Sequence, residues 1–247
     1  MAGHSHWAGI KHKKGKADKL RSKLFSKLSR EITVSAKLGL PDPSMNSRLR
    51  SAIQAARSAN MPKDNIERAI RKSQAQDEAS FEKVQYEGFG PKGVAFIVEA
   101  LTDNKNRTVS NIRSIFEKNS CSLGSEGSVS YQFSKLGLFK IRNTSHKEEE
   151  IFNLLLDSGA ENIENMDGCY EITTPSEKFN LLRETVESNF EEICYSGLIW
   201  RPKNYIKIEN KEIFTILDNF NSQLEDDDDV QNVFSNAKID KKLKMEI

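Results

Sequence analysis

Cysteine and long apolar runs are scarce in this sequence. Its three cysteines, Cys121, Cys169 and Cys194, form an odd set without a CxxC pair, which argues against a disulfide framework or a zinc site and suits a reducing compartment. The longest apolar run covers residues 94–98, whereas a membrane-spanning helix needs about 18 apolar residues. No export signal follows Met1, so we expect a soluble, cytoplasmic protein.

Histidine is also scarce, which limits the catalytic chemistry open to the chain. Of the four histidines, His4, His6 and His12 lie close to the N-terminus, and no Ser/His/Asp or Cys/His arrangement is visible. These three side chains could bind a metal, but no cysteine or carboxylate cluster lies beside them, so we favour no metal site there. We therefore expect a protein that is not an enzyme and has no catalytic residues.

The charges nearly cancel over the whole chain, but they are unevenly distributed. Lys and Arg number 37 and Asp and Glu number 36, which gives a formal net charge of +1. Residues 1–72 hold 17 basic and 5 acidic side chains, a net charge of +12, and the remaining residues hold 20 and 31, a net charge of −11. A polyanion is therefore expected to bind the N-terminal part, and the acidic part is expected to face away from it.

Residues 3–16 form a basic arm, in which three glycines and the lack of a helical period predict an extended segment. Trp7 and the three histidines lie among lysines, and flat rings between cations suit base stacking combined with phosphate neutralisation. The alternative is a solvated, lysine-rich tail that only keeps the protein soluble.

The segment after the arm has the pattern of a small helical domain. Apolar residues recur at every fourth position from Leu20 to Ile32, which predicts a helix over residues 17–38 that Gly39 and Pro41 end. Two further helices are expected, one after Pro43 and one that begins at Pro62. We therefore predict that residues 1–78 form a basic arm and a helical domain.

Strands and helices alternate in the rest of the chain, which predicts an α+β, multi-domain protein. The order β-α-β-β-α-β over residues 135–202 is the signature of a ferredoxin-like unit. Strands over residues 94–101 and 129–133, with a helix between them, supply half of the same order, and the segment after Pro202 completes it. We predict that the unit formed by residues 135–202 is inserted into a split domain of the same type, formed by residues 79–134 plus 203–247.

A glycine motif in the split domain resembles a dinucleotide-binding fingerprint. Gly88, Gly90 and Gly93 spell GxGxxG, but they precede the predicted strand instead of following it, and Pro91 lies where a helix should begin. We favour a glycine-rich turn and expect no cofactor.

Two charged segments each leave two interpretations open. Lys105 and Arg107 begin a predicted helix and could form a second anion site, although Asp103 and Asn104 could equally be helix caps. The acidic run at residues 225–229 could bind a hard cation, but a solvated loop between a helix and a strand is the more ordinary outcome.

Several long stretches of this sequence together resemble one known family. The stretches are MAGHSHWAGIKHKKGKADKLRSKLFSKLSREITVSAKLG, DPSMNSRLRSAIQAARSANMPKDNIERAI, YEGFGPKGVAFIVEALTDNKNRTVSNIR, GSVSYQF and LEDDDDVQNVFSNAKI. In this order they closely resemble the YebC/PmpR family, from Met1 to about Ile239. The sequence departs from the family at His6, where Lys is common, at Gly9, where Asn is common, and after Gly39, where the family has more glycine.

The resemblance implies a three-domain protein, helical at first and then α+β. Members of the family are described as DNA-binding transcriptional regulators in bacteria and as translational activators at the ribosome, including in mitochondria. The resemblance implies no enzymatic activity.

We therefore predict a nucleic-acid-binding regulator of gene expression, with DNA or ribosomal RNA as the partner. An extended basic arm suits a structured RNA crevice at least as well as a duplex, so the choice of polyanion stays open. The rival hypotheses are a protein adaptor and an enzyme with a phosphate-bearing substrate. The residues predicted to bind nucleic acid are His4, Trp7, Lys11, His12, Lys13, Lys14, Lys16, Lys19, Lys23, Lys27, Arg30, Arg48 and Arg50, with Lys63 and Arg71 as an extension.

Overall fold

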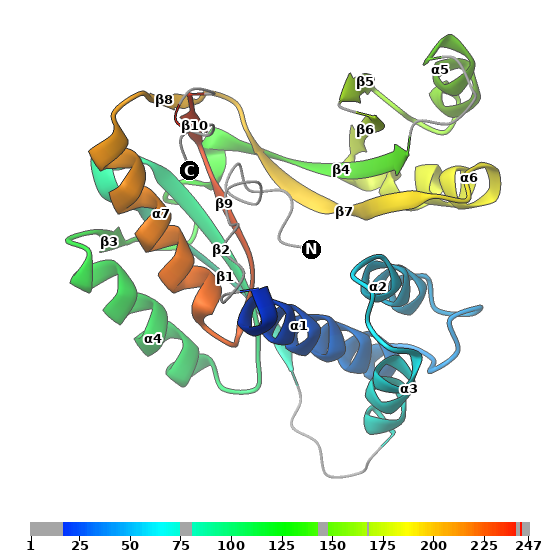
Figure 1. The fold of residues 1–247 in the computed structure, drawn as a ribbon, viewed down its shortest axis with the longest axis horizontal. Helices are drawn as coiled ribbons and strands as arrows, with labels where there is room; N and C mark the ends of the chain where they lie inside the picture. Colours follow the sequence, from blue (N-terminus) through cyan, green and yellow to red (C-terminus); the bar gives the residue numbers. More distant parts are fainter. Residues whose placement is uncertain (1–16, 75–80, 143–147, 167, 241–242, 244–247) are drawn as a thin grey trace. The chain divides into compact units, whose positions relative to one another are not determined.

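The structure combines a helical N-terminal region with several antiparallel sheets in a mixed α+β arrangement (Figure 1). The computed structural model describes residues 17–74, 81–142, 148–166, 168–240 and 243, and it gives only the backbone of residues 17–20 and 148. One compact unit combines Met1–Ser134 with Pro202–Ile247, and the other is Lys135–Arg201. Among the described residues, no helix is both long enough and apolar enough to cross a membrane.

Three helices form the N-terminal domain of the first unit. They are α1 (Ala17–Leu38), α2 (Ser47–Ser58) and α3 (Lys63–Lys72). The bounds of α1 agree with the predicted helix, and its residues Leu28 and Ile32 pack against Leu49 and Ile53 of α2 and Ile66 of α3 in one buried core. The spacing of three and four residues that predicted these helices is therefore the spacing that buries them.

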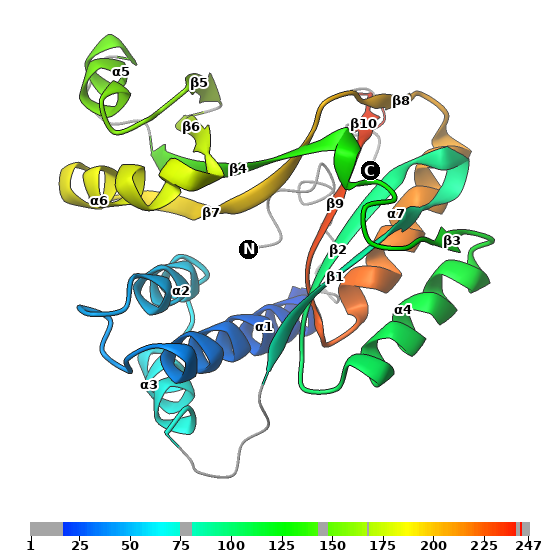
Figure 2. The same ribbon diagram turned by 180° about the vertical axis from the view of Figure 1, so that it is seen from behind.

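The rest of the first unit is built on a four-stranded antiparallel sheet with the order β3-β1-β2-β9. Its strands are β1 (Glu82–Phe89), β2 (Ala95–Thr102), β3 (Ser122–Leu123) and β9 (Val230–Ser235). Helices α4 (Lys105–Lys118) and α7 (Lys211–Asp226) cover one face of the sheet, as Figures 1 and 2 show from opposite sides. Phe220 of α7 packs edge-on against Phe96 and Phe116, with ring centroids 5.0 Å apart in each pair.

The beginning and the end of this sheet domain differ from the prediction. The domain begins with a β1–β2 hairpin, whereas a β-α-β-β-α-β unit begins with a strand followed by a helix. Strand β1 was not predicted, because its charged residues hid its strand character. The predicted strand over residues 129–133 is wrong, since Ser130–Gln132 form a short 3-10 helix and strand β4 begins only at Phe133. Strands β8 (Ile206–Ile208) and β10 (Ala237–Ile239) form a separate parallel pair.

The second unit contains four strands and two helices in the order β-α-β-β-α-β along the chain. Its elements are β4 (Phe133–Arg142), α5 (Glu148–Leu156), β5 (Asn162–Met166), β6 (Cys169–Pro175), α6 (Phe179–Asn189) and β7 (Ile193–Pro202). The sheet order is β5-β6-β4-β7. Phe139, Ile151, Ile172 and Leu182 lie at the centre of its core.

Candidate nucleic-acid interface

The predicted interface consists of the basic arm and the helical domain, of which the structure describes the second. The arm residues of the prediction lie outside the described residues: His4, Trp7, Lys11, His12, Lys13, Lys14 and Lys16. Lys19 lies on the first turn of α1, where only the backbone is described.

The next three cations of the prediction, Lys23, Lys27 and Arg30, form a basic stripe on α1. They are four and three residues apart, so their side chains project from one face of the helix. Opposite the basic stripe lies the acidic segment (residues 225–229), which forms the end of α7 and the turn into β9. The two elements are in direct contact although they are about 200 residues apart in the chain.

Two lysines of the stripe bind the end of α7. The Lys23 ammonium lies 2.8 Å from Asp226 Oδ1 and donates a hydrogen bond of 3.0 Å to the Asp226 carbonyl oxygen. The Lys27 ammonium donates to the Glu225 carbonyl oxygen at 3.0 Å. These carbonyls are at the negative end of the α7 dipole, which adds to the attraction of the carboxylates. Burial lowers the pKa of Lys27, although the nearby carboxylates act in the opposite direction.

Arg30 reaches further into the first unit than the lysines do. Its Nη1 donates to the carbonyl oxygens of Leu101 and Asp228, at 3.0 and 2.8 Å, and to Asp229 Oδ1 at 2.9 Å. This guanidinium therefore connects α1 to the end of β2 and to the acidic segment at the same time. With these three partners, Arg30 helps to hold α1 against the rest of the first unit.

Asp229 is the buried centre of this contact, with its side chain only 4% exposed. Besides Arg30, its carboxylate accepts hydrogen bonds from Arg107 Nη2 at 2.8 Å, Thr108 Oγ1 at 2.7 Å and Thr102 Oγ1 at 3.2 Å. Burial acts to raise the pKa of Asp229, but the hydrogen bonds and charges of Arg107, Thr108 and Arg30 outweigh it, so the pKa is lowered.

One expectation about the acidic run is therefore corrected. Residues 225–229 lie directly against the basic stripe of α1. The solvated loop is wrong for Asp229, which is buried. Among the described residues, no group of three histidine, cysteine or acidic side chains is arranged to hold a metal ion.

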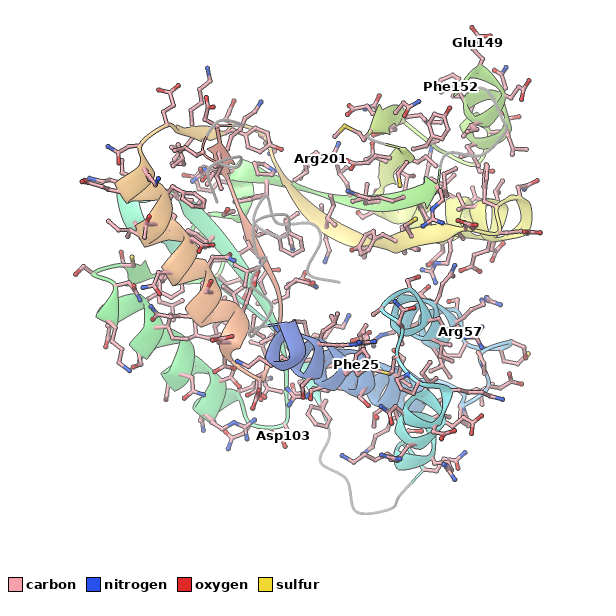
Figure 3. All side chains as sticks on the ribbon, viewed as in Figure 1. Phe25, Arg57, Asp103, Glu149, Phe152 and Arg201 are labelled. Carbon is pink, nitrogen blue, oxygen red and sulfur yellow. The ribbon has the colours of Figure 1, made fainter. Side chains whose placement is uncertain are left out.

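The other predicted cations on helices α2 and α4 also have partners within the chain. Arg48 Nε lies 2.8 Å from Glu31 Oε1, and Arg50 is half-buried. In the suggested second anion site, Lys105 binds Glu82 at 2.6 Å, and Arg107 binds Asp103 as well as Asp229. Figure 3 places Asp103 at the turn from β2 into α4.

The cap of α4 settles one of the alternatives that the sequence left open. The Asn104 side chain accepts a hydrogen bond from the Arg107 backbone N–H at 3.0 Å, so Asn104 caps the helix. The N-terminus of α4 is therefore occupied by a side chain of its own chain.

Helices α2 and α3 carry several exposed cations of the helical domain. We call Arg57, Lys63, Arg68 and Arg71 the outer cations, since all four side chains are exposed. Arg57 projects from α2 in Figure 3, and Lys63 is 85% exposed beside Glu67, with 3.6 Å between their charged atoms. Sequence reasoning named Lys63 and Arg71 as an extension but missed Arg57 and Arg68 as candidates. Arg57 follows the buried Ala56 and Arg68 precedes the buried Ala69, so each projects from a different face of its helix than the alanine, and this spacing was the available signal.

The glycine motif serves packing, as the favoured interpretation predicted. Gly88 lies in β1, and Gly90 and Gly93 flank the turn between β1 and β2. A Cβ at Gly88 would come 2.6 Å from Phe116 Cε1, and one at Gly90 would come 2.5 Å from Phe96 Cε2. The glycines thus let the backbone approach the aromatic core.

Comparison with known proteins identifies the family of the chain. Residues 5–76 match the family described as TACO1/YebC protein N-terminal domain, and residues 81–237 match the one described as TACO1/YebC second and third domain. The chain belongs to the TACO1/YebC family.

One relative and one solved structure show how far the similarity to TACO1/YebC proteins extends. A probable transcriptional regulatory protein of Pelagibacter ubique (strain HTCC1062) is 53% identical over 236 residues, which cover 96% of this chain and 98% of the relative. The crystal structure of a conserved hypothetical protein from Aquifex aeolicus is 41% identical and covers 96% of this chain and 98% of its own, with a TM-score of 0.80.

Proposed function

We propose that this TACO1/YebC protein is a nucleic-acid-binding regulator of gene expression whose target is duplex DNA and whose regulated step is transcription. The observation that carries the proposal is the charge of residues 1–72, a net of +12 from 17 basic and 5 acidic side chains. The name of the Pelagibacter ubique relative, a probable transcriptional regulatory protein, supports the regulatory role.

Two groups of side chains contact phosphate and bases in this proposal. The basic arm supplies lysines for phosphates and Trp7 and His12 for stacking on bases or insertion between them. The outer cations supply further phosphate contacts, because they are exposed. Lys105 and Arg107 are not part of the proposal, since each binds carboxylates of its own chain.

The proposal includes no catalytic step and no cofactor. Of the four histidines, His4, His6 and His12 belong to the arm, where we assign them to nucleic-acid contacts instead of acid–base chemistry. A regulator that acts by binding needs only a surface of the right charge and shape.

Salt dependence of binding tests the proposal directly. With about 6–10 phosphate contacts, the affinity for a 25-base-pair duplex should fall roughly 10³- to 10⁵-fold between 50 and 200 mM salt. The variant R57Q/R68Q/R71Q should flatten the slope of log K against log salt by about 2.7, because each phosphate contact contributes about 0.9. Fluorescence anisotropy of a labelled duplex measures both effects.

A matched variant controls for the change in net charge. R113Q/K118Q/K207Q removes three exposed cations from α4 and β8, and it should leave the slope close to that of the wild type. Equal slopes for the two variants would contradict the role of the outer cations. Co-migration of the protein with ribosomes on a gradient, lost on deletion of residues 1–16, would replace DNA by ribosomal RNA as the target.

A further inference from the structure

We propose that the basic stripe of α1 is a second polyanion-binding surface, which the acidic segment covers and withholds from nucleic acid. The inference rests on the proposed function and deepens it, because the acidic segment of the same chain would compete with phosphates for the cations of the stripe. In this arrangement, the end of α7 holds its oxygens where phosphate oxygens would otherwise lie.

The stripe has the dimensions of a phosphate-binding surface. Lys23 and Arg30 are seven residues apart, so the stripe is about 10 Å long on a helix that rises about 1.5 Å per residue. One strand of duplex DNA carries a charge about every 3.4 Å along the axis, so the stripe has the length of about three phosphates. The acidic segment offers the same kind of partner, namely carboxylate and carbonyl oxygens within 2.8–3.0 Å of all three cations.

The contact has a fixed inner part and an outer part that can separate. Asp229 is held by Arg107, Thr108 and Thr102, which belong to the same sheet domain, so it does not depend on α1 alone. The outer pair of Lys23 and Asp226 has side chains 25% and 56% exposed, and such ion pairs contribute little to stability and weaken with salt.

The outer part is also a polar cavity instead of apolar packing. A cavity of about 160 Å³ lies between the stripe and the acidic segment, and its lining consists of polar and charged residues: Lys23, Ser26, Lys27, Arg30 and residues 225–228. A polar cavity of this size is large enough for water molecules. The lysines can therefore exchange one set of oxygens for another without exposing a core.

The test compares two variants that change the net charge by the same amount. E225Q/D226N/D228N neutralises the outer carboxylates and keeps Asp229, whereas E117Q/E126Q/E209Q neutralises three exposed carboxylates elsewhere in the first unit. Without the charges of Glu225 and Asp226, Lys23 and Lys27 keep the neutral carbonyl oxygens of Asp226 and Glu225 as partners, which phosphates should displace more easily. Binding of a 25-base-pair duplex should then gain two phosphate contacts, so the slope of log K against log salt should steepen by about 1.8 relative to the control variant.

Substitution of Lys23 and Lys27 tests whether the steeper salt dependence comes from the stripe. K23Q/K27Q should leave the slope of the otherwise wild-type protein unchanged, because both lysines are covered there, and it should abolish the gain in E225Q/D226N/D228N. Circular dichroism melts of every variant confirm that the fold is kept. Equal slopes for E225Q/D226N/D228N and E117Q/E126Q/E209Q would overturn the proposal.

Heparin as a second probe separates this inference from the proposed function. If heparin shows the steeper slope and the duplex does not bind, the covered stripe is supported and duplex DNA is excluded as the target. If the duplex binds with equal slopes for both variants, the proposed function stands and the covered stripe is overturned. Absence of binding by both probes would overturn both.

Discussion

Glu87 is a buried carboxylate, 2% exposed, that fixes the segment between strands β3 and β4. Its Oε2 accepts hydrogen bonds of 2.8 Å from the backbone N–H groups of Val129 and Ser130, just before strand β4. Burial acts to raise the pKa of Glu87, but the hydrogen bonds from these groups, from Gly127 and from Gln85 outweigh it, so the pKa lies below the ordinary value of 4.5. The charged form is thus the one that the folded state prefers.

We expect Glu87→Gln to reduce the stability at pH 7 by about 2 kcal/mol, because charge-assisted hydrogen bonds are replaced by weaker ones. A lowered pKa means that the stabilisation is fully present above the ordinary pKa and is lost as the pH falls through the lowered value. The difference between wild type and variant should therefore shrink in acid. Urea unfolding at pH 7 and at about pH 3 measures it.

The control for this prediction is Glu126→Gln, since Glu126 lies in the same loop with an exposed side chain. It should change the stability by less than about 0.5 kcal/mol. A similar loss in both variants would mean that the hydrogen bonds of Glu87 are not the source of the effect.

At the scale of elements, the buried side chain of Asn46 fixes the turn between α1 and α2. Asn46 caps α2 by accepting from the Leu49 N–H at 3.0 Å, and its Nδ2 donates to the carbonyl oxygens of Ser35 and Leu40, both at 2.8 Å. The cap thus joins the end of one helix to the beginning of the next. Because Asn46 is buried, water cannot replace these hydrogen bonds.

We expect Asn46→Ala to destabilise the protein by about 2 kcal/mol, from the lost cap and the two carbonyls left without their donor. Asn104→Ala removes the cap of α4 but no other hydrogen bond to a distant segment, so about 1 kcal/mol is expected there. Chemical unfolding of the two variants measures the difference. If Asn104→Ala proves equally costly, the link between α1 and α2 adds nothing to the cap.

The elements also show what the sequence can and cannot predict. The helix over residues 17–38 was predictable because Leu24, Leu28 and Ile32 recur at a local spacing that the core requires. The partner of Lys23 was not predictable, since Asp226 lies 203 residues away and only the fold brings the two together. Strand β1 was missed because its burial alternates weakly among charged residues such as Glu82 and Lys83.

The candidate site was partly predictable for the same reason. Charge counting located the basic part of the chain, but it assigned Lys23, Lys27 and Arg30 to phosphates without regard to oxygens of the chain itself. A count of charges cannot show which of them meet in three dimensions. On α2 and α3, the sequence predicted Lys63 and Arg71, and burial adds Arg57 and Arg68 to the exposed cations.

At the scale of the whole first unit, Asp229 connects the turn before β9 to three elements that are distant from it in sequence. Its carboxylate receives Arg30 from α1, Thr102 from β2, and Arg107 and Thr108 from α4. The contacts of Asp229 with Arg30, Arg107 and Thr108 also lower its pKa, because they favour the charged carboxylate in the folded state. The Asp229 carboxylate therefore binds side chains of both the helical domain and the sheet domain.

We expect Asp229→Asn to reduce stability at pH 7 by about 2 kcal/mol, less than for a fully buried pair because Arg107 is 47% exposed. The loss should fade as the pH falls through the lowered pKa of the wild-type carboxyl group. Amide hydrogen exchange should also become faster in α1, which loses its partner.

Asp228→Asn is the matched control, since Asp228 is exposed and contributes its backbone carbonyl oxygen to Arg30. It should leave both the stability and the exchange of α1 nearly unchanged. Slow exchange of α1 in Asp229→Asn would show that the helix is held without this carboxylate.

The long separation between α1 and its acidic partner also sets an order in time during synthesis. The basic stripe leaves the ribosome 198–203 residues before the oxygens that cover it. At a synthesis rate of about 5–20 residues per second, each newly made chain carries an uncovered basic helix for about 10–40 s beside a ribosome, the largest polyanion in its surroundings.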